Sequence, residues 1–195
     1  MRYSLDPISE GCYPGTTVLI NKLGIRDEAI LDEAETLATY INASKLEEQQ
    51  LDGEFDFPHY CAIHHFLFSD LYDWAGQIRT VNISKKGTLF CLAENIEKQA
   101  QLVFQRLADC NFFRGLSHEA FVDEIVDFYC VTNMLHPFRE GNGRTQRAFL
   151  TQLIRAAGYD INWYEVDTDL LMFATIQSAN GVTDLLRNIL SQAIN

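Results

Sequence analysis

The sequence predicts a mainly α-helical protein with one β-hairpin, folded as a single domain. Apolar residues recur at helical spacing along most of the chain, and only the stretch 78–92 is short-period and rich in β-forming residues. With 195 residues and 47% apolar content, the chain is long enough to bury one core. The most charged stretch, 47–56, contains no proline, so we interpret it as a loop inside the domain rather than a linker.

The first part of the chain, residues 1–26, is predicted to be an extended arm. Asp6-Pro7, Pro14-Gly15 and Gly24 interrupt it with turn signals. A helix is expected from Asp27, where the apolar spacing becomes helical. The residues of this apolar series are Ile30, Leu31, Ala34, Leu37, Ala38 and Ile41.

A second helix is expected from Phe57 to Trp74, with Pro58 in its first turn and Gly76 as its stop. We interpret its His64 as facing the core, and His59 and His65 as surface residues. After it, the segments 78–83 and 88–92 are rich in β-forming residues and are separated by Ser-Lys-Lys-Gly, which is typical of a hairpin. An isolated hairpin is marginal in water, so it must lie on the helical body, with its outer edge open.

The remaining chain is predicted to be helical. The expected helices are 94–107, 117–135, 143–157, 167–176 and 183–193, and Gly158 is a suitable αL stop for the third. Two of them have clear inward faces. These are Phe121, Ile125, Phe128, Tyr129 and Leu135 in one, and Phe149, Leu150, Leu153 and Ile154 in the other.

The charge balance argues against nucleic acid as a ligand. A net charge of −12 is opposite to what contact with a phosphate backbone requires. The exception is a local cluster of four arginines, which indicates a small anion or, alternatively, a solvated basic stripe. They are Arg139, Arg144, Arg147 and Arg155.

The cysteines and the absence of long apolar runs predict a cytoplasmic location. Five scattered cysteines favour free thiols in a reducing compartment over disulfides or a zinc site. The first residues lack the apolar run of a signal peptide, and no stretch approaches the roughly 18 apolar residues of a membrane span.

The segment 136–147 carries the chemistry. Glycines and Asn142 allow several backbone N–H groups to converge, and a helix starting near Gly143 adds its own free N–H groups and positive dipole end. This combination is typical of a phosphate site, although a plain glycine-rich turn between helices is the alternative. Neither the P-loop nor the dinucleotide fingerprint fits, because no lysine follows the glycines and position 146 is Gln146.

His136 and Glu140 add a candidate base and a candidate metal ligand to this loop. A carboxylate is a hard oxygen ligand suited to Mg²⁺ on phosphate oxygens. An imidazole titrates near neutrality and can take a proton from an attacking hydroxyl. A zinc pair on one helix is a third option, which Pro137 and the glycines oppose.

This segment resembles the Fic family signature H-P-F-x-[DE]-G-N-G-R-x-x-R at every defined position. The resemblance extends to 63–68 and to Trp74-Ala75-Gly76, with Arg79, Val81 and Ile83. The arm, through Tyr13-Pro14-Gly15 and Leu23-Gly24-Ile25, is similar to the toxin members of Fic toxin–antitoxin pairs.

The resemblance implies a Fic fold, a helical bundle with a β-hairpin flap at 78–92 over the active site, and AMP transfer from ATP to a protein Tyr, Ser or Thr. It implies that His136 is the general base, that Phe138 anchors the loop and that Glu140 holds Mg²⁺. It assigns ATP binding to Arg139, Gly141, Asn142, Gly143, Arg144 and Arg147. The flap edge that would dock the target protein is Ile83, Ser84, Lys85, Lys86, Gly87, Thr88, Leu89 and Phe90.

Two further features concern nucleotide choice and control. Related kinases carry lysine at the position of Gly143, so this residue favours AMP transfer. Fic proteins are commonly inhibited by a helix with [ST]-x-x-x-E-[GN], and no such motif is present in this sequence. The resemblance therefore implies a separate small antitoxin whose glutamate pairs with Arg147, and it suggests the ATPase subunits of DNA gyrase or topoisomerase IV as targets.

Two other functions stay open at this point. The first is Fic-type transfer of another nucleotide or of phosphocholine, because the motif recognises phosphates and not the base. The second is a non-catalytic module that binds a peptide along the flap edge.

Overall fold

The computed structural model describes residues 4–5, 10–49, 51–85 and 87–195, and it confirms the mainly helical class. The described residues contain seven α-helices and one small antiparallel sheet. The helices are α1 (Glu28–Glu48), α2 (Phe57–Phe68), α3 (Ile96–Asp109), α4 (His118–Leu135), α5 (Asn142–Ala156), α6 (Thr168–Ser178) and α7 (Asp184–Ala193). The strands are β1 (Ser4–Leu5), β2 (Ile83–Lys85) and β3 (Thr88–Leu89).

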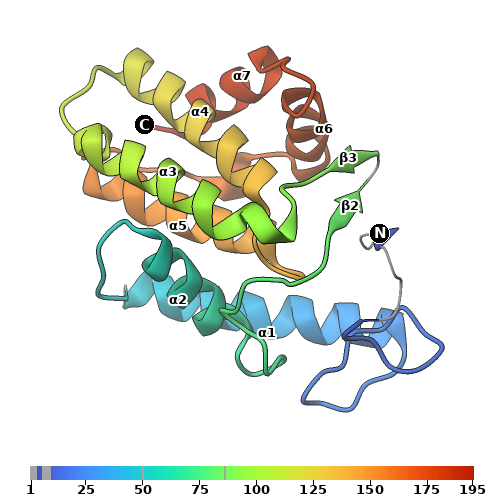
Figure 1. The fold of residues 1–195 in the computed structure, drawn as a ribbon. Helices are drawn as coiled ribbons and strands as arrows, with labels where there is room; N and C mark the ends of the chain where they lie inside the picture. Colours follow the sequence, from blue (N-terminus) through green and yellow to red (C-terminus); the bar gives the residue numbers. More distant parts are fainter. Residues whose placement is uncertain (1–3, 6–9, 50, 86) are drawn as a thin grey trace.

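Helix α5 lies in the middle of the fold, with α2 on one side and α4 on the other (Figure 1). Its predicted inward residues are buried, and so are those predicted for α4. Phe149 packs against aromatic rings from three other helices, with centroid separations of 5.3 Å to Tyr60, 5.6 Å to Phe104 and 5.8 Å to Phe128. This aromatic core holds the start of α5 in place relative to α2 and α4.

Helix α1 begins as predicted, because the Asp27 side chain caps it by accepting hydrogen bonds from Ala29 and Ile30. Its orientation was not predicted. The apolar residues Ile30, Leu37 and Ile41 are exposed. The buried residues are Leu31, Glu35, Thr39, Asn42 and Leu46, so three of the five are polar.

Helix α2 ends at Phe68, six residues before the predicted end at Trp74. The amide of Asn42 on α1 donates to the carbonyl of Leu67 at 3.3 Å, so this last-turn carbonyl is satisfied without a further helical turn. The chain then makes turns that bury Leu71 and Tyr72. The predicted helix was too long because these apolar residues continue the helical spacing in the sequence.

The hairpin exists, but its strands are shorter than predicted and one edge is not open. Residues 78–82 form no strand; instead the N–H of Arg79 donates to the carbonyl of Pro137 at 2.9 Å. Strand β2 lies between β1 and β3, with Ser4 opposite Ser84 and Leu5 opposite Ile83. The chain's own N-terminal residues therefore occupy the edge of β2 that was predicted to be free.

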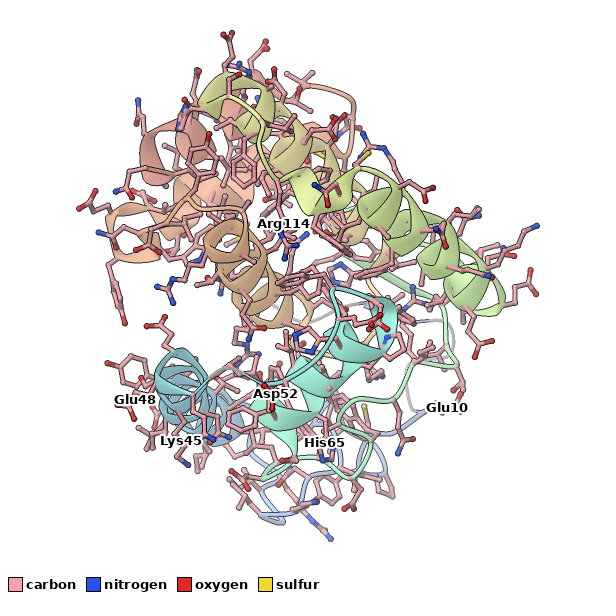
Figure 2. All side chains as sticks on the ribbon, turned by 90° about the vertical axis from the view of Figure 1, so that its left-hand side faces the viewer. Glu10, Lys45, Glu48, Asp52, His65 and Arg114 are labelled. Atoms are coloured by element: carbon pink, nitrogen blue, oxygen red, sulfur yellow. The ribbon has the colours of Figure 1, made fainter. Side chains whose placement is uncertain are left out.

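The hairpin stands at the side of the helical body, next to α6 (Figure 1). Figure 2 shows that side chains fill the space between the ribbons. The exposed Glu10 and Glu48 lie on opposite sides of that view. His65 is exposed as predicted, but His59 is buried and pairs with Gln152 at 2.9 Å. Within the described residues, no helix has both the length and the apolar character needed to cross a membrane.

Candidate active site

The loop between α4 and α5 owes its shape to two residues in the left-handed region. His136 ends α4 with a φ of 43°, and Gly141 precedes α5 with a φ of 81°. A Cβ atom at Gly141 would lie 2.2 Å from the Phe68 ring, so glycine is required there for space as well as for conformation. A histidine at positive φ is uncommon and stores strain. Strained backbone conformations of this kind cluster at functional sites, where they place a side chain in a required position.

Two side chains brace the loop from inside. Asn142 accepts from the N–H of Phe138 at 2.9 Å and donates to the carbonyl of the same residue at 2.8 Å. Phe138 is fully buried, as predicted, and its ring lies 3.8 Å from that of His64. The predicted contact of Asn142 with ATP stays a prediction: its side chain bonds within the loop, and the second N–H of its amide and its backbone N–H are the groups that it could offer a ligand.

His64 is buried beneath the loop, as predicted, and fixes it by two hydrogen bonds. Its Nε2 donates to the carbonyl of Glu140 at 3.0 Å, and its Nδ1 accepts from the N–H of Gly76 at 2.7 Å. Burial lowers the pKa of His64 to about 3, so the ring is neutral at physiological pH. Both ring nitrogens are used, and this histidine is therefore a support rather than a base.

A hydrogen bond fixes which ring nitrogen of His136 carries the proton. Its Nδ1 lies 2.9 Å from the carbonyl of Asn133, which can only accept, so Nδ1 carries the proton and Nε2 keeps its lone pair. Burial lowers the pKa of His136 to about 3, with Arg79 and Lys85 adding to the effect. The ring of Phe90 stacks on the imidazole at 3.7 Å and fixes its plane. The group is a neutral, oriented proton acceptor.

The ionised form of Glu140 is disfavoured by its surroundings. Burial raises its pKa, and the neighbouring Glu35 carboxylate raises it further. Its Oε1 accepts from the N–H of Gly141 at 2.8 Å and lies 3.7 Å from Nη2 of Arg144. A cation bound at this carboxylate would relieve both effects.

The three arginines of the segment have different environments. Nη2 of Arg139 donates to the carbonyl of Glu10 at 3.3 Å, which connects it to the N-terminal arm, and its role in ATP binding stays a prediction. Arg144 pairs with Glu35. For Arg147, no ion pair to any described carboxylate is found, although burial lowers its pKa. A largely buried arginine without an acidic partner is suited to an anionic ligand.

Two cavities meet at Arg147. The first, of about 360 Å³, lies between the flap, the loop and α6, and we call it the catalytic pocket. It is lined by Lys85, Thr88, Phe90, Tyr129, Asn133, His136, Gly143, Gln146, Arg147, Trp163, Val166, Thr168, Leu171, Met172, Thr175 and Ile176. The second, of about 560 Å³, is a groove between α1 and α5 that contains Tyr40, Arg144, Arg147 and Arg155, and we call it the α1–α5 groove.

The predicted flap residues are only partly brought to the catalytic pocket. Lys85, Thr88 and Phe90 line it, whereas Ile83 is buried beneath the sheet and Leu89 is exposed. Ser84 pairs with Ser4 and Leu89, and Gly87 is in the turn. Lys86 lies outside the described residues.

Arg79 connects the flap to the loop, and its role could not be read from the sequence. This buried guanidinium donates to the carbonyl of His136 at 2.8 Å, to that of Val81 at 2.7 Å and to that of Cys91. Glu35 was missed as well, since an acid in a helix 100 residues from the motif looks like a surface residue. The predicted apolar face of this helix does not include position 35, so the sequence carried no signal for it.

Comparison with known proteins agrees with this geometry. Residues 54–154 match the Fic/DOC family. The chain belongs to the Fic/DOC family. A probable protein adenylyltransferase Fic of Salmonella typhimurium is 39% identical over 194 residues, which covers 97% of this chain and 96% of that protein. A probable protein adenylyltransferase of Sinorhizobium fredii, y4lH, is 42% identical over 177 residues, covering 90% and 89%.

Solved Fic domains share the fold. The BepC protein of Bartonella tribocorum, solved with bound AMPPNP, superposes with a TM-score of 0.90 at 27% identity over 95% of this chain and 96% of that one. Together with the curated relatives, this makes the present Fic/DOC protein a nucleotidyltransferase of the protein adenylyltransferase type.

Proposed function

We propose that this Fic/DOC protein moves AMP from ATP to a tyrosine, serine or threonine hydroxyl of another protein in the cytoplasm. One observation carries the proposal: the catalytic pocket brings together His136, whose Nε2 is the unprotonated ring nitrogen, Arg147 and the N-terminus of α5. These are a base, a cation and a phosphate cradle at one place. A nucleotide bound in the related BepC structure supports ATP as the substrate.

The chemistry follows from the position of the base. Nε2 of His136 takes the proton of the target hydroxyl while the hydroxyl oxygen forms a bond to the α-phosphorus. The bond from the α-phosphorus to the oxygen bridging the β-phosphate breaks, and pyrophosphate leaves. First-turn N–H groups of α5 have no carbonyl partner within the helix, so they are available to stabilise the charge on the phosphoryl oxygens.

The residues present fit a magnesium ion that arrives with the nucleotide. Glu140 offers a partly buried carboxylate whose pKa is raised by desolvation and by the neighbouring Glu35, so a cation would stabilise its charged form. Among the described residues, no group of three or more potential metal ligands comes together. Mg²⁺ usually takes one or two protein carboxylates and completes its shell with phosphates and water. Glu140 would hold the ion, whose charge would neutralise the phosphates.

The apolar side of the catalytic pocket is suited to the base of the nucleotide. Val166, Leu171, Met172 and Ile176 contribute this wall, opposite His136. Nucleotide sites are commonly apolar pockets with a few directed polar groups. We assign this wall to the base and the α5 end of the pocket to the phosphates.

The flap is the proposed docking edge for the target. Extended segments bind exposed strand edges through main-chain hydrogen bonds. Because β1 already pairs with β2, a target strand would replace Ser4–Leu5 or pair along the outer edge of β3.

Two labelled nucleotides test the reaction. The protein is incubated with a bacterial lysate and ATP labelled on the α- or the γ-phosphate. Label from the α-phosphate is expected on protein and is lost in His136→Ala. Label from the γ-phosphate would make the protein a kinase and overturn the proposal. A parallel panel with GTP, CTP, UTP and CDP-choline identifies a transferase of another group.

The proposed targets are the ATPase subunits of DNA gyrase and topoisomerase IV. Purified subunits are added in place of the lysate, and α-phosphate label is expected on them. Strong labelling of lysate proteins with none on either subunit rejects these targets but leaves AMP transfer intact.

We further propose that a small antitoxin inhibits the enzyme from the α1–α5 groove. Arg147 lines both this groove and the catalytic pocket. A glutamate that enters from the groove would pair with the Arg147 guanidinium, which would then be unavailable to the γ-phosphate. The exposed Tyr40 of α1 lines the groove and would pack against an amphipathic helix.

Growth of a bacterial host tests the antitoxin. Induction of the enzyme is expected to stop growth, and His136→Ala is expected to be harmless. Co-expression of the product of a short neighbouring reading frame should restore growth, and replacement of the glutamate in its [ST]-x-x-x-E-[GN] motif should abolish this effect. Tyr40→Glu, on the groove and 60% exposed, should remain toxic but escape inhibition. A rescue that survives both changes contradicts the proposed mode of binding.

A further inference from the structure

Glu35 is a buried acid that lies outside the motif and outside the matched residues 54–154. It is in the second turn of α1 and only 6% exposed. A buried carboxylate is unfavourable unless it is paired and hydrogen-bonded. Its partners therefore indicate what it is for.

The side-chain contacts of Glu35 converge on Arg144 or support the carboxylate that holds it. Oε1 of Glu35 accepts from Nη2 of Arg144, and Oε2 accepts from the hydroxyl of Tyr72. Nη1 of Arg144 donates to Oγ1 of Thr39 at 3.3 Å. The guanidinium lies over the ring of Phe68, 4.8 Å from its centroid. Helices α1 and α2 thus hold this arginine directly, and Tyr72, after α2, holds the carboxylate that binds it.

A second carboxylate is close to the same nitrogen. Oε1 of Glu140 is 3.7 Å from Nη2 of Arg144, four residues along the chain. Without Glu35, Arg144 could close this gap and form a hydrogen-bonded pair with Glu140. Such a pair would occupy the proposed magnesium ligand and a proposed phosphate-binding cation at once.

We propose that Glu35 is a positioning residue that holds Arg144 away from Glu140 and directs it to the polyphosphate end of ATP. The proposal rests on the nucleotide transfer described above. The remaining N–H groups of the guanidinium, which offers five donors in a fixed plane, are then available to phosphate oxygens. Helix α1 is thereby part of the nucleotide site.

The first measurement is binding of AMPPNP with Mg²⁺ by titration calorimetry. Glu35→Gln is expected to weaken binding about tenfold, as expected for the loss of a charge-assisted hydrogen bond. The KM for ATP should rise more than kcat falls, with His136 unchanged. Glu35→Asp keeps the carboxylate and should recover part of the affinity. Glu33→Gln removes the same charge from the exposed face of α1 and should bind like the wild type.

A double-mutant cycle separates positioning from simple stability. In an Arg144→Ala background, Glu35→Gln is expected to cause no further loss of affinity, because there is no arginine left to position. Equal losses in both backgrounds, or wild-type binding by Glu35→Gln, would overturn the proposal. If the wild type transfers no α-phosphate label to protein, the proposed function is contradicted, whatever the binding data show.

Thermal melting of every variant is recorded to exclude unfolding. If Glu35→Gln does not fold, Tyr72→Phe removes the second hydrogen bond of the carboxylate and keeps the ring that stacks on Trp74 at 4.3 Å. Its affinity for AMPPNP should fall about threefold in the presence of Arg144 and not at all in Arg144→Ala, consistent with a weaker, indirect effect. An equal fall in both backgrounds would also overturn the proposal.

Discussion

The two histidines of the site show how position decides the role of a residue. Both are buried, neutral and held by a hydrogen bond to a backbone carbonyl. In His64 the second nitrogen accepts from Gly76, so the ring only supports the loop. In His136 the second nitrogen is the unprotonated one, and the ring lines the catalytic pocket. The residue type alone does not distinguish them.

The lowered pKa of His136 makes a prediction about the pH dependence of transfer. With a pKa of about 3, the imidazole stays unprotonated down to mildly acidic pH. The rate of α-phosphate transfer should therefore change less than about twofold between pH 8 and pH 5.5, where an ordinary histidine with a pKa near 6.5 would lose about tenfold. The measurement is the initial labelling rate at saturating ATP, and a titration near 6.5 would contradict the assignment.

The glycines of the loop differ in what they tolerate, and this gives a matched pair of variants. Gly141→Ala would place a Cβ at positive φ and 2.2 Å from Phe68, so about 2 kcal/mol or more of stability should be lost. At Gly143 the nearest atom to a new Cβ is Nη1 of Arg147 at 3.6 Å, an ordinary contact. Gly143→Ala should melt within a few degrees of the wild type. Equal melting temperatures for both variants would contradict the loop geometry.

At the scale of elements, the flap is held by one side chain rather than by its own length. Arg79 connects three carbonyls of the flap and the loop, while β2 and β3 together contain only a few strand residues. A short hairpin is marginal by itself. The flap therefore depends on the buried guanidinium for its position over His136.

Arg79→Lys tests this dependence. Lysine keeps the charge but lacks the planar fork that reaches three acceptors, so buried carbonyls lose partners and the free energy of unfolding should fall by about 2–3 kcal/mol. Amide exchange in Ile83–Lys85 should accelerate, and transfer should decrease. Arg106→Lys, in an exposed pair with Glu124, is the control and should change stability by less than about 0.5 kcal/mol. Unchanged exchange in the flap would mean that another contact holds it.

The ends of elements were predicted least well, and the reason is physical. Apolar spacing predicted α2 beyond Phe68, because Leu71 and Tyr72 are buried although the helix has ended. The strand predicted from Ile78 was lost to hydrogen bonds with the loop, as the bond from Arg79 to Pro137 shows. In both cases a partner distant in the sequence replaced the local pattern.

Across the whole molecule, the local part of the site was predictable and the distant part was not. His136 to Arg147 lie in one segment, so spacing and residue type were enough to propose a phosphate loop with a base. Glu35, His64 and Arg79 reach this segment only through packing of α1, α2 and the flap. The hydrogen bonds of Arg139 to Glu10 and of Asn142 to Phe138 were not predicted either, because these partners are set by the folded chain.

Two buried neutral histidines also affect the stability of the whole fold. His64 and His136 have pKa values of about 3 in the folded protein, whereas an unfolded histidine titrates near 6.5. Between these values the unfolded chain binds more protons, so stability is complete above pH 6.5 and is lost as the pH falls towards 3. The slope is up to about 1.4 kcal/mol per pH unit for each histidine.

Glu140 changes the pH dependence of stability in the direction opposite to that of the two histidines, so variants of the two kinds should shift the slope oppositely. Its raised pKa lets the folded state bind a proton that the unfolded state releases, so acid stabilises this residue and offsets part of the slope. Urea unfolding at pH 7.5, 6 and 5 should show a shallower slope in His64→Gln and a steeper one in Glu140→Gln. His65→Gln, on the exposed side of α2, controls for loss of a histidine. If both variants change the slope in the same direction, the histidines and Glu140 cannot have the opposed pKa shifts that burial imposes on them.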